Sequence, residues 1–142
     1  TNQAARRAPI DAYLAHAIRS LYDCTRHLNV TIMVVTEFGR TNGLNAGGAT
    51  DHGVGGALWL FGKNVKGGVY NCHDGTGLGA QWPELDLNPV QPVATDFRTV
   101  LAELLIKRFG ITTNAGLDDV IPGWSDLVQT GLPQYTLLDC IS

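Results

Sequence analysis

The sequence predicts an α/β fold with few strands and two main helices. Apolar side chains recur at helical spacing over residues 9–27 and again over residues 95–109. The first of these segments leads directly into a continuous apolar run at residues 30–35, which is typical of a strand buried on both faces. This order of helix and strand favours an αβ unit packed into a parallel sheet.

Length and composition predict a single domain over residues 1–142. A chain of 142 residues falls within the usual domain size of roughly 100–200 residues. Hydrophobic residues make up 44% and charged residues 16%, with a net charge of −3. This charge balance does not favour a nucleic-acid partner. No apolar run approaches the roughly 20 residues that a membrane-spanning helix needs, so no membrane span is expected.

The first helix is expected to begin near Pro9, because proline suits the first turn of a helix. Residues 1–8 are then a frayed start, and the apolar positions form one buried stripe. Residues 57–61 predict a second buried strand, with Trp59 and Phe61 in the core. Residues 62–68 predict a turn, residues 69–71 a short edge strand, residues 73–83 an irregular segment and residues 89–93 an extended one.

The second helix carries both start and stop signals. Thr95 is the expected N-cap, and Asp96 in the first turn complements the helix dipole. Lys107 and Arg108 precede Gly110, which predicts the end of the helix. Its expected buried stripe consists of Phe97, Val100, Leu101, Leu104 and Leu105. Residues 117–124 predict a compact segment, and residues 135–141 are compatible with a strand.

The three cysteines Cys24, Cys72 and Cys140 lie far apart and form no CxxC pair, which disfavours a structural zinc site. An odd count leaves at least one thiol free unless another chain pairs with it. One disulfide is compatible with the spacing, which does not select the pair. Burial as small apolar side chains is an equal alternative.

Glu37 and Arg40 follow the strand at residues 30–35, where ligands bind in open α/β sheets. A carboxylate at this place can bind a cation or act as a general base. It can equally pair with Arg40 or cap the loop. The Arg40 guanidinium suits a carboxylate, phosphate or sulfate, and the alternative is a salt bridge to Glu37 or Asp51.

Asp51 and His52 form a second acid–base pair after a polar, glycine-bearing loop. An imidazole beside a carboxylate can supply metal ligands, or a base with its orienting partner. Adjacent residues of an extended strand point to opposite faces, however, so the two need not share one site. The sequence contains no GxSxG, GxGxxG or P-loop motif, which disfavours those routes to catalysis and nucleotide binding.

Three segments together resemble the C-terminal part of a bacterial exported family known as domain of unknown function 1501. They are VVTEFGRTNGLNAGGATDHGVGGALWLFGKNVKGG, ATDFRTVLAELLIKRFG and LDDVIPGW, and the match runs from about Tyr13 to Trp124. That family is placed near the sulfatases in the alkaline phosphatase superfamily. The resemblance implies part of an α/β/α sandwich, with a site at the carboxyl ends of its strands and a periplasmic or cell-surface location.

In that superfamily, one or two divalent metals activate an oxygen nucleophile that attacks a phosphate or sulfate ester. The resemblance implies that Glu37 and His52 are metal ligands for zinc, calcium or manganese, with Asp51 a further ligand or the orienter of His52. Arg40 would bind an oxyanion or organise the loop. The superfamily often has Asp-His where this chain has Glu37 and Phe38. Its nucleophile and first metal ligands belong to an N-terminal half that residues 1–142 do not supply.

The leading hypothesis is therefore the C-terminal portion of a metal-dependent phospho- or sulfo-ester hydrolase, inactive as an isolated chain. Its partners would be the N-terminal part or other chains of an assembly. The alternative is a non-enzymatic exported surface or structural protein that retains the fold. A third hypothesis, a carbohydrate-binding module, requires exposed aromatic side chains at Trp82, Trp124 and Tyr135.

Overall fold

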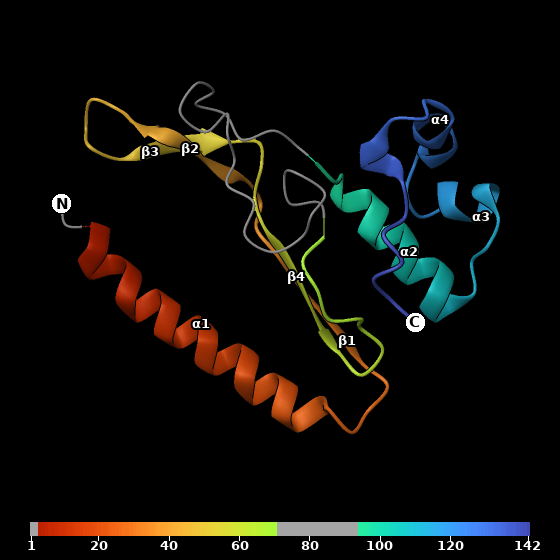
Figure 1. Ribbon diagram of the computed structural model, residues 1–142, viewed down its shortest axis with the longest axis horizontal. Coiled ribbons are helices and arrows are strands. Elements are labelled where there is room, and N and C mark those ends of the chain that lie inside the picture. Colours follow the sequence, from red (N-terminus) through yellow and green to blue (C-terminus); the bar gives the residue numbers. More distant parts are fainter. Residues whose placement is uncertain (1–2, 71–93) are drawn as a thin grey trace.

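The computed structural model describes residues 3–70 and 94–142, which form a mixed α/β structure (Figure 1). A two-stranded ribbon runs between α1 on one side and a group of shorter helices on the other. The described elements are α1 (Gln3–Thr25), β1 (Thr31–Val35), β2 (Gly39–Leu44), β3 (Thr50–Gly53), β4 (Leu58–Gly62), α2 (Phe97–Phe109), α3 (Asn114–Asp118), α4 (Trp124–Gln129) and the 3-10 helix η1 (Pro133–Tyr135).

Helix α1 confirms the first predicted helix but begins earlier, at Gln3, with Pro9 inside it. Residues 3–8 contain three alanines and two arginines, which are strong helix formers, so the helix extends through the expected frayed start. The predicted buried stripe is wrong within the described part of the chain. Leu14 is 37% exposed and Leu21 is 49% exposed, because a two-stranded ribbon is too narrow to cover one face of a 23-residue helix.

Strands β1 and β4 confirm the two apolar strands, but the predicted parallel pairing is wrong for them. They pair antiparallel, with Thr31 opposite Gly62 and Val35 opposite Leu58. A parallel pair needs a crossover, usually a helix, whereas residues 36–57 contain a hairpin that returns the chain beside β1. Trp59 is 47% exposed, so its expected place in the core is also wrong.

The glycine-bearing loop after β1 is a second antiparallel pair, the β2–β3 hairpin. Its tip is organised by the side chain of Asn45. The Asn45 Oδ1 atom accepts hydrogen bonds from the backbone N–H groups of Gly47 and Ala49. Gly48 adopts a φ of 71°, which favours glycine. Local polar contacts therefore fold a segment that lacks an apolar pattern.

Helix α2 confirms the second predicted helix and its end at Gly110, which has a φ of 71°. Its N-cap is Asp96 instead of Thr95, and the Asp96 side chain accepts from the Arg98 backbone N–H at 2.9 Å. The expected apolar stripe is wrong in part. Phe97 is 57% exposed, whereas the polar residues Thr99 and Glu103 are fully buried.

The core of the helical part joins α2 to residues 117–124, which confirms a compact segment there. It consists of Ala102, Leu117, Ile121 and Trp124. Trp124 is only 3% exposed, which removes one of the three aromatics expected to bind carbohydrate. Tyr135 is half-buried with the Arg98 guanidinium over its ring, and Trp82 lies outside the described residues.

The predicted strand at residues 135–141 reduces to a single bridge between Ile141 and Val65. Residues 69–70 form no strand, and the predictions for residues 71, 73–83 and 89–93 lie outside the described residues. Cys24 and Cys140 are free thiols, whereas Cys72 lies outside the described part. None of the described helices is long and apolar enough to cross a membrane.

Candidate functional site

The four candidate site residues lie on or just before the β2–β3 hairpin, beyond the carboxyl end of β1 (Figure 1). Glu37 lies in the bend between β1 and β2 and is exposed. Among the described residues it makes no hydrogen bond or ion pair. Its carboxylate is therefore available to a ligand.

Arg40 and His52 are brought together by the register of the hairpin. They are directly opposite each other on β2 and β3, and opposite residues of an antiparallel pair project from the same face. The Phe38 ring joins them: it stacks on the His52 imidazole with centroids 3.8 Å apart and an interplanar angle of 23°. The Arg40 Cζ atom lies 5.1 Å from the centroid of the same ring. Phe38, Arg40 and His52 therefore form one cluster.

Arg40 is also held by the backbone of the neighbouring strand. Its Nη1 atom donates to the Thr50 carbonyl oxygen at 3.1 Å. The salt bridge that the sequence offered as an alternative, to Glu37 or Asp51, is not among the ion pairs of the described residues. The guanidinium charge is thus exposed and without a described carboxylate partner.

Asp51 is occupied by the hairpin itself. Its Oδ1 atom accepts from Asn45 Nδ2 at 2.7 Å, and its backbone N–H donates to Thr41 Oγ1 at 3.0 Å. Asp51 and His52 are consecutive residues of β3, so strand alternation directs their side chains to opposite faces. The structure therefore groups His52 with Arg40 and leaves Asp51 with Asn45.

The donor set fits part of a metal site but not a whole one. The described residues contain no group of three or more His, Cys, Asp or Glu side chains that could hold a metal ion. Glu37 and His52 have oxygen and nitrogen atoms without described hydrogen-bond partners and can fill two positions of a ligand set. A catalytic zinc site normally uses three protein ligands. Any complete site would need ligands beyond these two.

Sequence reasoning missed the part that Phe38 plays in this cluster. The available signal was the turn-forming run Asn45 to Gly48 between two short polar segments, which is typical of a hairpin. A hairpin at this place brings residues 40 and 52 opposite each other. Phe38, two residues before Arg40, then falls on the same face by strand alternation.

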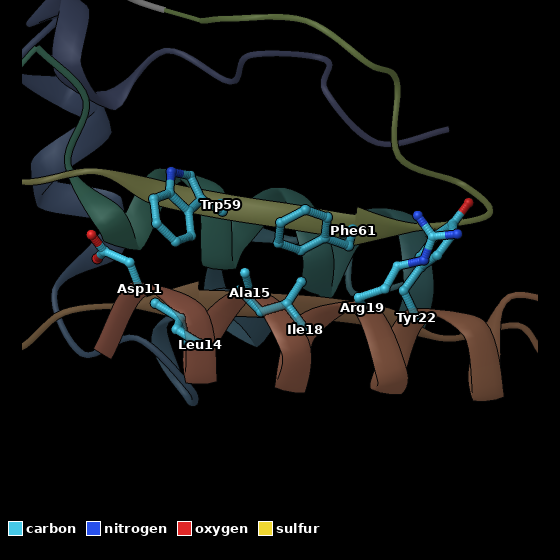
Figure 2. A pocket seen from close by; sticks show the side chains of 8 residues that line it. All are labelled: Asp11, Leu14, Ala15, Ile18, Arg19, Tyr22, Trp59 and Phe61. Atoms are coloured by element: carbon cyan, nitrogen blue, oxygen red, sulfur yellow. The ribbon is translucent and has the colours of Figure 1, made fainter. Parts of the chain in front are cut away.

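A cleft lies between α1 and β4 (Figure 2). This cleft has a volume of about 710 Å³ and is mainly apolar. Trp59 and Phe61, two residues apart on β4, both face the helix. On α1 the cleft is lined by Asp11, Leu14, Ala15, Ile18, Arg19 and Tyr22. It lies apart from the hairpin cluster, with which it shares no residue.

Comparison with known protein families shows to which family the chain belongs. The model of the family described as "Protein of unknown function (DUF1501)" matches residues 2–121. The chain belongs to this family. No curated protein and no solved structure matches it. The DUF1501 match includes the hairpin cluster, the apolar cleft and all of α2, so both the cluster and the cleft lie within the family domain.

Proposed function

We propose that this DUF1501 chain supplies the strand-end hairpin of a divalent-metal-dependent phospho- or sulfo-ester hydrolase. The observation that supports this proposal best is the grouping of Arg40 with His52, just beyond the strand end at which Glu37 lies. A cationic fork beside an imidazole suits an anionic ester. The sulfatase-like resemblance supports the same class of reaction.

In this proposal each side chain has a separate part. Glu37 and His52 provide two ligands to zinc, calcium or manganese, and a metal bound there would polarise the ester oxygen as a Lewis acid. Arg40 has one donor bound to Thr50, which leaves its other N–H groups for the ester oxygens. Asp51 stabilises the hairpin through its hydrogen bond with Asn45. In a site completed by residues outside this chain, Asp51 would be a further metal ligand.

The proposal assigns the nucleophile and the remaining ligands to residues outside this chain, either in the rest of a longer protein or in an assembly. Further strands beside β1 would complete an alkaline-phosphatase-like α/β/α sandwich. The resemblance also supports export to the periplasm or the cell surface. The purified chain is then expected to show no hydrolysis of p-nitrophenyl phosphate or sulfate.

Metal titration tests the proposal directly. Calorimetry with zinc, manganese and calcium should detect binding of at least one ion, weakened at least about tenfold by Glu37→Ala and by His52→Ala, because each removes a ligand. Asp126→Ala and His16→Ala remove an exposed acid and an exposed histidine elsewhere and serve as matched controls.

A folded, metal-free chain with no affinity for these ions would contradict the proposal. So would binding that all four variants retain. Ester hydrolysis by the purified chain, abolished in both Glu37→Ala and His52→Ala, would place the nucleophile within residues 1–142.

A non-enzymatic structural role is the second candidate, and one observation favours it. Arg40, Asp51 and His52 each have a contact within the hairpin, to Thr50, Asn45 and Phe38 respectively. If these contacts are their whole purpose, alanine at each position lowers the free energy of unfolding while the wild-type chain binds no metal. The same titration therefore separates the two functions.

A further inference from the structure

Arg40 and His52, two of the residues of the proposed site, both contact Phe38. We propose that it is a positioning residue, which fixes the His52 imidazole and the Arg40 guanidinium in one arrangement for a shared ligand. This inference rests on the proposed function. It adds to that function a residue that has no ligating or proton-transferring atom of its own.

The stack between Phe38 and His52 restricts the imidazole. A histidine ring rotates over a broad range about its outer side-chain torsion, so an exposed His52 alone would present its nitrogens in many directions. A near-parallel stack at 3.8 Å and 23° removes much of that freedom. The contact uses the face of the imidazole, whereas the nitrogen lone pairs lie in the ring plane and stay accessible.

The guanidinium of Arg40 is fixed at two points. The Phe38 ring lies 5.1 Å from Cζ, within the range of a cation–π contact, and the Thr50 carbonyl oxygen accepts from Nη1. Two contacts hold a side chain that would otherwise be free to move in solvent. The Arg40 donors and the His52 nitrogens are therefore arranged before a ligand arrives, which lowers the entropic cost of binding it.

Phe38 itself is well placed to be the rigid member of the cluster. It is half-buried, whereas Arg40 and His52 are both exposed. The next residue, Gly39, is buried against the backbone of Gly55, so the chain on which Phe38 stands is closely packed. Because its backbone is closely packed, the phenyl ring has a fixed position, and its contacts fix the exposed side chains of Arg40 and His52.

The test compares Phe38→Leu, which removes the ring, with Phe38→Tyr, which keeps it. Two measurements are made on the full chain: the ring-current shift of the His52 imidazole protons by NMR, and zinc affinity by calorimetry. Phe38→Leu should abolish the shift and weaken zinc binding about tenfold, the usual effect of losing a residue that orients a metal ligand. Phe38→Tyr should preserve both.

Phe109→Leu is the matched control, because Phe109 is an exposed phenylalanine at the end of α2 far from the hairpin (Figure 1). It should change neither measurement. Circular dichroism checks that each variant folds. If Phe38→Leu does not fold, the wild-type NMR spectrum still tests the inference. Wild-type His52 imidazole protons without a ring-current shift would show that the stack on Phe38 is absent and would overturn the inference.

Two failures are distinguishable. If Phe38→Leu is folded and binds zinc as tightly as wild type, Phe38 has only a structural role, and the metal ligands Glu37 and His52 are unaffected. If the wild-type chain binds no zinc, manganese or calcium, the proposed function fails, and the inference that rests on it fails as well.

Discussion

The thiol of Cys140 lies in an environment that opposes its ionisation. Its side chain is 2% exposed, and burial, followed by the charge of the nearby Glu103, raises the pKa of this thiol to about 11. Cys24, on α1, is an exposed free thiol. Because the thiolate is the reactive form of cysteine, the two residues should differ sharply in reactivity.

We expect iodoacetamide at pH 8 to modify Cys24 and spare Cys140, of which roughly one thiol in a thousand is ionised at that pH. Peptide mass spectrometry of a Cys72→Ser chain would measure both rates. The raised pKa also means that the folded state holds this proton more tightly than the unfolded state. The associated stability is present below pH 9.0 and is lost as the pH rises towards about 11. Equal labelling of the two thiols would contradict this expectation.

At the scale of an element, the β2–β3 hairpin depends on a glycine at its base. Gly39 is buried and pairs with Gly53. A Cβ atom added to Gly39 would lie 1.5 Å from the carbonyl oxygen of Gly55, a distance at which backbone has to move. Gly43, near the tip of the same strand, has no heavy atom within 4 Å of such a Cβ.

Gly39→Ala should therefore lower the free energy of unfolding by about 2 kcal/mol or more, because the added methyl group overpacks a closed site. It should also displace Arg40 from His52, which NMR of the two side chains would detect. Gly43→Ala is the matched control and should stay within about 0.5 kcal/mol of wild type in urea unfolding. Similar losses for the two variants would refute the steric explanation.

The apolar spacing and the glycine stop signal predicted helix α2 and its C-terminal end, but not its N-cap. The helix ends at Gly110, as the place of this glycine after Lys107 and Arg108 predicted, and Gly110 adopts the left-handed conformation. Thr95 and Asp96 are both good N-cap residues, and the prediction of Thr95 is wrong. Asp96 is the cap in the structure, and its carboxylate also binds the Arg98 guanidinium at 2.7 Å and 2.8 Å. That hydrogen-bonded pair also holds the pKa of Asp96 below its usual range.

At the scale of the whole molecule, the C-terminal residues join the β ribbon to the helical part. Ser142 donates its backbone N–H to the Asn64 carbonyl, and Cys140 accepts from the Lys66 N–H. On the other side, the fully buried Glu103 of α2 accepts from the backbone N–H groups of Leu138 and Ile141, at 2.9 Å and 2.7 Å. One carboxylate thus fixes the segment that connects the two parts.

Glu103→Ala should lower the free energy of unfolding by on the order of 3 kcal/mol, because it leaves two backbone donors without acceptors. Glu103→Gln should lower the free energy of unfolding by less, because its one amide oxygen can still accept a hydrogen bond from one of the two backbone N–H groups. Asp126→Ala, at an exposed acid on α4, is the control. Urea unfolding gives the stability, and hydrogen exchange of the Leu138 and Ile141 amides should accelerate in Glu103→Ala. Unchanged exchange at these amides would show that the carboxylate does not hold the segment.

The sequence by itself determined some of the local elements and the family. Continuous apolar runs specified β1 and β4, and a 3.6-residue period with a glycine stop specified α2, because these signals depend only on neighbours along the chain. Tertiary structure alone decided that β1 pairs antiparallel with β4 and that Glu103 is buried. Each of these depends on which distant backbone lies alongside, and periodicity carries no information about that partner.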